Sequence, residues 1–243
     1  MSGRFYVVGD IHGCARELDT LLGGLPVDPS DTVAFIGDYI DRGPESRRVV
    51  DMMLAWRDRD DVATVFLRGN HEDMCLGYVG RRGQWGEAWR ANGGNATLQS
   101  YGIPTNVQGT AAADRMPESH LEFLESLVPW SVADDRFLLV HAGIRPGRAL
   151  QDQDEEDLLW IREEFIASPH ALPYTVIFGH TPQRHVFVDL PYKVGIDTGC
   201  VYGGRLTALE LSEGVVHQVT YGDRTVRQSP LSAGPQRSRL ARP

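Results

Sequence analysis

The first third of the sequence repeats one pattern three times: a short apolar run followed closely by glycine and polar residues. The runs cover residues 5–8, 32–36 and 62–67, and their lengths and β-branched content favour buried strands. Helical patterns at residues 15–22 and 44–56 separate them, the second with Pro44 at a favourable first position. This βαβαβ order predicts a sheet that is at least partly parallel.

The pattern changes twice in the rest of the chain. Between about residues 80 and 130 it is irregular, with a Pro-bounded helical pattern at residues 118–127, so we predict a mainly helical insertion. Further buried strands are predicted at residues 137–140 and 175–178. From residue 186 onward, short alternating segments separated by Gly, Pro and Asp predict antiparallel strands, which we expect to form a second sheet.

Length and composition fit one large α/β domain. The chain has 243 residues, of which 42% are hydrophobic and 23% are charged, so a sizeable core is available. We assign this domain to residues 1–223, with the helical insertion inside it. Residues 224–243 are rich in Arg and Pro and poor in large apolar groups, which predicts a disordered tail.

Charge and cysteine usage narrow the classes of partner. A formal net charge of −9 argues against a nucleic-acid partner, because affinity for the phosphate backbone depends on Lys and Arg. No apolar run has the length of a membrane span, and the strand pattern at residues 4–8 leaves no room for a signal peptide. Cys14, Cys75 and Cys200 have no paired spacing and are predicted to be free thiols. These features predict a cytoplasmic protein without a membrane partner, and they carry no signal of oligomeric state.

Polar residues follow four of the predicted strands. Asp10 and His12 come after the first strand, Asp38 after the second, Asn70 after the third and His141 after the fourth. Loops at the carboxyl ends of parallel strands converge on one crevice. Any one of these segments alone is typical of a turn or cap, but their joint occurrence in this order predicts a metal site. Oxygen and nitrogen donors without a thiolate favour manganese or iron, with zinc at one position as an alternative.

These segments resemble the motifs of PPP-type serine/threonine protein phosphatases of the small bacterial type, within the calcineurin-like metallophosphoesterase superfamily. The resemblance covers about residues 5–211 and rests on residues 9–13 (Gly-Asp-Ile-His-Gly), 37–43 (Gly-Asp-Tyr-Ile-Asp-Arg-Gly), 69–72 (Gly-Asn-His-Glu), 141–143 (His-Ala-Gly) and 179–180 (Gly-His). Many superfamily members have a further histidine after the one at residue 180. This chain lacks it, and the PPP branch lacks it too. The resemblance implies an α/β fold in which a sandwich of two mixed β-sheets is flanked by helices.

The resemblance also implies two divalent metal ions, most simply manganese, with iron or zinc as alternatives. Asp38 would bridge the two ions. The ligands would be Asp10, His12 and Asp38 for the first ion, and Asp38, Asn70, His141 and His180 for the second. Such a pair activates a shared hydroxide for direct in-line attack on phosphorus, so no covalent phosphoenzyme is expected.

Four further residues would act on the phosphoryl group. His71 would donate a proton to the leaving group, with Asp41 holding its imidazole. Arg42 would bind phosphoryl oxygens through its planar guanidinium. Arg162 lies in a segment that resembles the one carrying a second phosphate-binding arginine in bacterial members. Its alternative interpretation is a solvated charge on a helix around residues 155–165.

Two other segments allow more than one interpretation. Trp85, Trp89 and residues 92–94 could line a substrate groove, but a helix end with a cap and buried aromatic side chains explains them equally well. Asp197 ends another predicted strand, where it is either a turn residue or a carboxylate that orients His180.

The leading functional interpretation is a metal-dependent serine/threonine protein phosphatase, acting on a phosphoprotein or a phosphorylated small molecule, because the Asp41–Arg42 and Asn70–His71 pairs are intact. The alternative is a dinucleoside polyphosphate hydrolase, such as a diadenosine tetraphosphate hydrolase, since relatives with the same metal site perform that reaction. Those relatives often alter the Asp-Arg pair or carry Asp after the Asn-His pair, whereas this chain has Glu72 there. A non-catalytic metal-binding interaction module is disfavoured, because neither a ligand nor the acid is missing.

Overall fold

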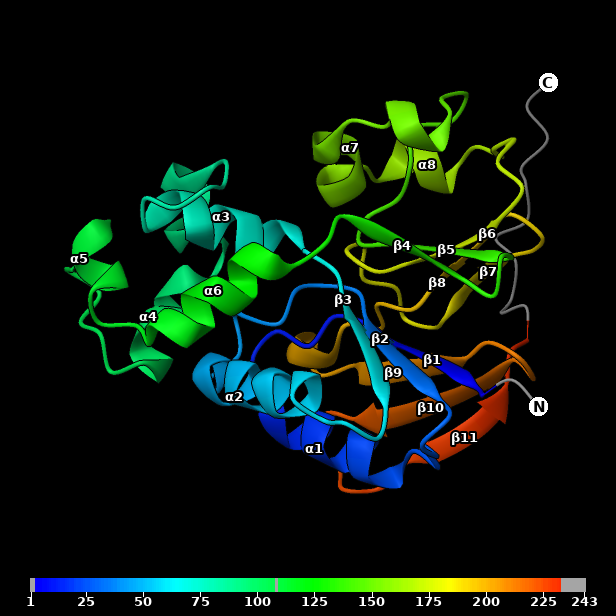
Figure 1. Ribbon diagram of the computed structural model, residues 1–243, viewed down its shortest axis with the longest axis horizontal. Coiled ribbons are helices and arrows are strands. Elements are labelled where there is room, and N and C mark those ends of the chain that lie inside the picture. The colour runs from blue at the N-terminus through cyan, green and yellow to red at the C-terminus, as the bar shows by residue number, and fades with distance from the viewer. Residues whose placement is uncertain (1–2, 108, 233–243) are drawn as a thin grey trace.

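The strands of this chain form two sheets at the centre of the molecule, with helices outside them (Figure 1). The computed structural model describes residues 3–107 and 109–232. The strands are β1 (Phe5–Val8), β2 (Thr32–Phe35), β3 (Ala63–Phe66), β4 (Trp130–Ala133), β5 (Phe137–Val140), β6 (Thr175–Phe178), β7 (Phe187–Asp189), β8 (Lys193–Gly195), β9 (Arg205–Glu210), β10 (Val215–Thr220) and β11 (Arg227–Pro230). The α-helices are α1 (Ala15–Gly24), α2 (Ser46–Arg57), α3 (Asn70–Tyr78), α4 (Gly94–Ser100), α5 (Thr110–Ala113), α6 (Glu118–Ser126), α7 (Glu155–Trp160) and α8 (Glu163–Ile166). The 3₁₀ helices are η1 (Gly86–Ala88), η2 (Arg90–Asn92), η3 (Leu150–Asp152) and η4 (Cys200–Tyr202).

The larger sheet has the strand order β11-β10-β9-β1-β2-β3. Strands β1, β2 and β3 are parallel, with Tyr6 opposite Val33 and Val33 opposite Thr64. The predicted βαβαβ unit is confirmed, because α1 and α2 carry the chain back between parallel strands. On the other side of β1, strands β9, β10 and β11 each run antiparallel to their neighbour.

The smaller sheet has the strand order β4-β5-β6-β8-β7. Strands β5, β6 and β8 are parallel, and β4 and β7 pair antiparallel at the edges. Both sheets are therefore mixed and helices flank them, which confirms the predicted fold class. The expectation that all strands after residue 186 form a second sheet was wrong, since β9 and β10 complete the larger sheet. Alternation along a strand indicates its buried face but does not identify the neighbouring strand.

Alternating side chains of the strands divide the core into three layers. Val8 of β1 belongs to the cluster on the side of α1 and α2, whereas Val7 points between the two sheets and joins Leu139 of β5. On the outer face of the smaller sheet, Val140 packs in one cluster with Phe165 of α8. Each fully buried aliphatic side chain stabilises the fold by about 1.5–3 kcal/mol. The layer between the sheets thus contains side chains of both sheets.

The segment from about residue 80 to 130 contains η1, η2, α4, α5 and α6. Helices α4 and α6 pack against α2, and α6 also packs against α3. Buried side chains of the segment, including Trp89 and Leu124, belong to the same cluster as those of α1 and α2. The helical insertion is therefore continuous with the core of the larger sheet.

The first part of the predicted disordered tail contains a strand. Arg227–Pro230 form β11, in which Pro230 lies opposite Val215 and Arg227 lies opposite Gln218 of β10. Main-chain hydrogen bonds to a sheet edge order this segment, although its side chains are exposed and contribute little apolar burial. Residues 233–243 of the predicted tail lie outside the described residues.

The three cysteines are buried free thiols. Across residues 3–107 and 109–232, no helix has both the length and the apolar character needed to cross a membrane.

Candidate active site

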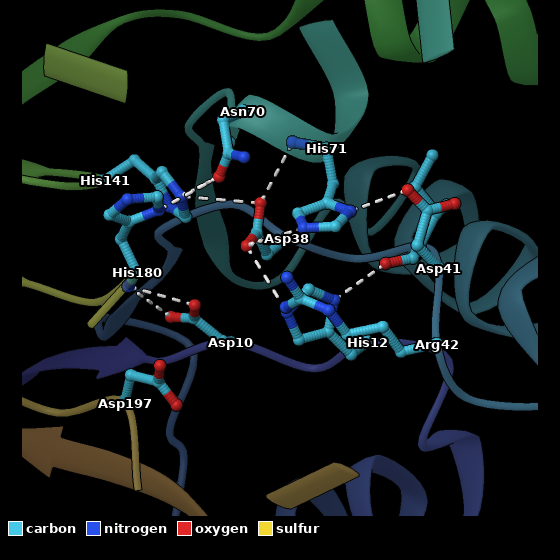
Figure 2. A network of polar contacts seen from close by, with 12 residues as sticks. Asp10, His12, Asp38, Asp41, Arg42, Asn70, His71, His141, His180 and Asp197 are labelled. Atoms are coloured by element: carbon cyan, nitrogen blue, oxygen red, sulfur yellow. Dashed lines mark hydrogen bonds and ion pairs between the residues drawn. The ribbon is translucent and has the colours of Figure 1, made fainter. Parts of the chain in front are cut away.

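The motif residues come together at the carboxyl ends of the parallel strands of both sheets. Figure 2 shows Asp38 in the middle, with His141 and His180 on one side and His12 and His71 on the other. The segments that carry them are the loop after β1 (Asp10, His12), the loop after β2 (Asp38, Asp41, Arg42), the start of α3 (Asn70, His71), and the residues after β5 (His141) and β6 (His180).

Several of these residues have a left-handed backbone, which turns their side chains into the crevice. The φ angle is +46° at His12, +54° at Asp38 and +62° at His180. This conformation is unfavourable for residues with a Cβ and persists only where the surroundings hold it. Here the backbone carbonyl of Asp38 accepts the N–H groups of Ile11 at 3.0 Å and His12 at 2.8 Å. The loops after β1 and β2 are therefore joined directly.

A buried glutamate supports the loop after β2. Glu72 accepts the backbone N–H groups of Gly69 and Asp38 through Oε2, both at 2.9 Å, and that of Tyr39 through Oε1 at 2.8 Å. Burial, followed by the negative charge of Asp38, raises the pKa of Glu72 to about 8. This supporting role was not predicted, although the Gly69-x-x-Glu72 spacing, in which Glu is the third residue of a helix, is visible in the sequence.

Asp38 is shared by two clusters of potential metal ligands. Its Oδ2 lies 3.3 Å from Nε2 of His12 and 4.0 Å from Nε2 of His71, and its Oδ1 lies 3.4 Å from Nε2 of His141. The clusters are His12–Asp38–His71 and Asp38–His141–His180, and the ligand atoms within each lie within 4.8 Å of one another. Burial opposes ionisation of Asp38, but the surrounding histidines, first His141 and then His71, hold its pKa well below the usual range.

Asn70 connects the two histidines of the second cluster. Its Oδ1 accepts a hydrogen bond from Nδ1 of His180 at 2.9 Å and lies 3.1 Å from Nε2 of His141. His141 donates from Nδ1 to the carbonyl of Ile36 at 2.8 Å. In the first cluster, Nδ1 of His12 donates to the carbonyl of Ile40, in the loop after β2, at 2.9 Å.

Hydrogen bonds through Nδ1 leave the other ring nitrogen of these histidines, Nε2, with a lone pair. Burial lowers the pKa of His12 to about 3, and it also lowers the pKa of His141 and, more strongly, that of His180. A neutral imidazole that donates from Nδ1 carries a lone pair on Nε2. Those of His12 and His141 face oxygens of Asp38, and the buried Nε2 of His180 has no hydrogen-bond partner among the residues described. A cation would satisfy these atoms, so the donor set fits divalent metal ions.

Asp10 lies beside this centre and faces the backbone of His180. Its Oδ2 accepts the N–H of His180 at 2.9 Å. Burial, followed by repulsion from Asp197 and Asp38, raises the pKa of Asp10 well above the usual range. Asp197 accepts the N–H of Gly199 at 2.9 Å, as a turn residue does, and no bond joins it to His180 in the part of the chain that the structure describes. Three carboxylates buried close together are expected where cations bind.

His71 and Asp41 are in direct contact. Nδ1 of His71 donates to Oδ2 of Asp41 at 2.6 Å, and both side chains are buried. Burial alone would lower the pKa of His71, but the carboxylates of Asp38 and Asp41 raise it. Within the described ranges, Nε2 of His71 has no hydrogen-bond partner. A proton on this nitrogen is therefore available to a group bound in the crevice.

Asp41 has two more partners, both from the helical insertion. Trp89 donates from Nε1 to Oδ2 at 2.8 Å, and the hydroxyl of Thr97 donates to Oδ1 at 2.6 Å. Trp89 is fully buried, so the interpretation as a buried aromatic side chain is correct for it and the groove interpretation is wrong. Thr97 was not predicted, because no local pattern links it to Asp41.

The two arginines approach the crevice from different elements. Arg42 has a φ angle of +67°, and its Nη1 contacts Nε2 of His12. Its Cζ lies 5.6 Å from the ring centre of Tyr202, an exposed side chain of η4. Arg42 thus lies at the first cluster, beside an open face of the protein.

Arg162 occupies the break between α7 and α8, where a single helix around residues 155–165 was the alternative interpretation. It is exposed, and no described carboxylate lies within 4.0 Å of it. Burial, the charge of His141 and the charge of Arg162, in this order, lower the pKa of His180. The positive charge of Arg162 thus disfavours protonation of His180, and no opposing charge in the described part of the chain is bound to the arginine.

Comparisons with known proteins identify the family of this chain. The family model described as calcineurin-like phosphoesterase matches residues 3–222. The chain is 31% identical to a bis(5'-nucleosyl)-tetraphosphatase PrpE (asymmetrical) from Bacillus cereus strain AH820, over 86% of this chain and 91% of the relative. The crystal structure of a proposed diadenosine tetraphosphatase is similar with a TM-score of 0.68 and 25% identity, over 91% of this chain and 95% of that chain. A protein serine/threonine phosphatase from Saccharomyces cerevisiae, similar to human phosphatase PP5, has a TM-score of 0.60 at 14% identity, over 97% and 82%, which shows the fold alone.

The predicted resemblance is confirmed for the superfamily and not for its protein phosphatase branch. The relative that is 31% identical to this chain is named a tetraphosphatase, whereas the protein phosphatase structure is distant in sequence. Because the family model matches residues 3–222, well over half of the chain, the chain belongs to the calcineurin-like phosphoesterases.

Proposed function

We propose that this chain hydrolyses bis(5'-nucleosyl) tetraphosphates asymmetrically, to a nucleoside triphosphate and a nucleoside monophosphate. The observation that carries this proposal is the likeness to tetraphosphatases over 86% of the chain, supported by a cluster of metal ligands with Asp38 at its centre. The proposal reverses the order of the two leading sequence interpretations.

Two divalent cations would be held by residues that share Asp38. The sets are Asp10, His12 and Asp38 for one cation, and Asp38, Asn70, His141 and His180 for the other. Oxygen and nitrogen donors make manganese the first candidate, with iron or zinc as alternatives. When bound, such cations neutralise phosphoryl charge and lower the pKa of water.

The protein's own side chains then bind the phosphates and supply a proton. Arg42 and Arg162 offer positive charge at the two clusters of a chain whose net charge is −9, so phosphate binding is local. His71 holds a proton on Nε2 and would give it to the oxygen of the leaving nucleotide. Asp41 keeps the other ring nitrogen protonated, which makes Nε2 the donating atom.

A serine/threonine protein phosphatase is the second candidate. The 2.6 Å contact between His71 and Asp41 favours it, because the alkoxide that leaves phosphoserine needs a proton more than a leaving nucleotide phosphate does. The same site can serve both reactions, so the groups around it decide the substrate.

The test compares kcat/KM for diadenosine tetraphosphate, a phosphoserine peptide and p-nitrophenyl phosphate, with manganese first and then with iron and zinc. We expect the tetraphosphate value to exceed the peptide value by at least about tenfold, with ATP and AMP as products. A higher value for the peptide would make the protein phosphatase the better assignment. Metal binding without turnover of any of the three substrates would instead favour the non-catalytic module.

A further inference from the structure

The helical insertion reaches the catalytic groups through Trp89 and Thr97. The carboxylate of Asp41 is fully buried, and each of its oxygens has a donor from the insertion. Oδ2 is shared by the indole N–H of Trp89 at 2.8 Å and Nδ1 of His71 at 2.6 Å. The orientation of the His71 ring is thus tied to a carboxylate that the insertion holds in place.

Thr97 holds Asp41 at two points. Its hydroxyl donates to Oδ1 of Asp41 at 2.6 Å and accepts the backbone N–H of Asp41 at 2.9 Å. Asp41 needs this support, because its φ angle of +74° is unfavourable for a residue with a Cβ. The threonine therefore fixes both the backbone and the side chain of the residue that faces His71.

The same stretch of the insertion also contacts Arg42. The carbonyl of Gly93 accepts the backbone N–H of Arg42 at 3.3 Å, and Gly93 has a φ angle of +111°. A Cβ at Gly93 would lie 2.7 Å from Cγ of Arg42, and one at Gly94 would lie 2.5 Å from the ring of Trp89. The two glycines allow the segment to approach the arginine and the indole at once.

We propose that residues 89–97 are a positioning segment of this active site, in which Trp89 and Thr97 orient the Asp41–His71 pair and Gly93 orients Arg42. The proposal rests on the hydrolytic function proposed above, because it takes His71 as the proton donor. The competing explanation is plain core packing, since Trp89 also packs against Tyr78 with ring centres 4.8 Å apart. The two explanations predict different effects on catalysis when a single N–H or O–H group is removed.

The test uses Trp89→Phe and Thr97→Val, which keep most of the packing and remove one donor each. Tyr78→Phe is the matched control, because it removes a hydroxyl that donates to the carbonyl of Val107 at 3.1 Å and does not contact Asp41. For phenyl phosphate, a substrate with a poor leaving group, we expect kcat to fall about tenfold in both variants with little change in KM. For 2,4-dinitrophenyl phosphate, whose leaving group needs no proton, the loss should stay below about twofold.

A second measurement does not depend on turnover. In metal-free protein, long-range ¹H–¹⁵N spectra report the protons on the imidazole nitrogens of His71. The wild type and the Tyr78→Phe control should show a proton on Nδ1 that exchanges slowly with water, and the two test variants should show faster exchange at this nitrogen. If Trp89→Phe does not fold, the results for Thr97→Val decide between the positioning role and core packing.

Equal losses with both aryl phosphates, or an unchanged imidazole spectrum, would overturn the positioning role and leave core packing as the explanation. If the wild type hydrolyses neither diadenosine tetraphosphate nor any phosphoester, the proposed function fails and the spectra alone decide whether the segment orients His71. Failure of the two proposals can thus be distinguished.

Discussion

The two sheets contribute to one crevice in different ways. The larger sheet supplies its polar residues from three strand ends that are consecutive in the chain, and Asp38 joins their loops through its backbone carbonyl. The smaller sheet supplies His141 and His180 from β5 and β6, and we propose that Arg162, in the break between α7 and α8, joins them. The two sets meet at the carboxylate of Asp38, whose Oδ2 faces His12 and whose Oδ1 faces His141. One half of the site is thus a product of the βαβαβ unit, whereas the other half depends on how the sheets pack.

A substitution of Asp38, which faces both halves of the site, should lower activity more than any other change proposed here. In Asp38→Asn, we expect kcat/KM for the preferred substrate to fall by at least about a thousandfold, because one side chain serves both clusters. Metal content measured by mass spectrometry should fall as well. Asp197→Asn is the matched comparison, since this buried carboxylate accepts the N–H of Gly199 and belongs to neither cluster, and its loss should be much smaller. An Asp38→Asn protein that keeps both metals and a tenth of the activity would show that the halves work separately.

The half formed by the larger sheet could be predicted from the sequence, and the reason is local geometry. Apolar runs of strand length, helical patterns between them and polar residues directly after them place Asp10, His12, Asp38 and Asn70 at one sheet edge. His141 follows a later predicted strand and belongs to the same pattern, whereas the assignment of His180 to the site came from the resemblance to a family. Both histidines lie at the predicted site because β5 and β6 are parallel and their sheet packs against the first.

What could not be predicted depends on contacts between distant parts of the chain. Trp89 and Thr97 bond Asp41 across 48 and 56 residues, and neither lies in a motif that names its partner. The pairing of β9 with β1 was missed for the same reason, since an alternating strand fits the edge of either sheet. The β11 segment lacks apolar residues, so its order comes from main-chain hydrogen bonds that composition does not reveal.

The two arginines provide a second way to compare the halves, with a smaller expected effect. Arg42 is fixed by the carbonyl of Gly93 and lies against His12, so Arg42→Ala should lower kcat/KM by about a hundredfold. Arg162 is exposed and has no ion-pair partner in the described part of the chain, so Arg162→Ala should lower kcat/KM by about tenfold, mainly through KM. Steady-state kinetics measure which variant loses more kcat/KM. The Lys substitution at each position is measured in the same way. Unchanged kinetics in Arg162→Ala would support the solvated-charge interpretation and remove it from the site.

The smallest expected effect concerns the smaller sheet away from the crevice. Lys193 of β8 is fully buried, and its Nζ donates to the carbonyls of Phe165 and Ser168 at 2.5 Å and of Ile166 at 3.3 Å. Lys193→Met keeps the length of the side chain but leaves these carbonyls without their donor, so the free energy of unfolding should fall by about 1–3 kcal/mol. Urea denaturation measures this loss. We expect kcat/KM to change by less than about twofold, because the contacts lie outside the site, and a large loss would mean that α8 transmits strain to Arg162.

The pH dependence of this variant shows whether burial or hydrogen bonding dominates at Lys193. Burial lowers the pKa of Lys193 from its ordinary value of 10.5, although the charge of Asp189 opposes this. Between the lowered pKa and 10.5, the unfolded chain binds more protons at this position than the folded protein does, so the contribution of Lys193 to the free energy of unfolding rises with pH. Lys193→Met lacks this titration. The difference in unfolding free energy between wild type and variant should therefore widen as the pH is raised from neutral toward 10.5. A difference that narrows would mean that the carbonyls raise the pKa more than burial lowers it.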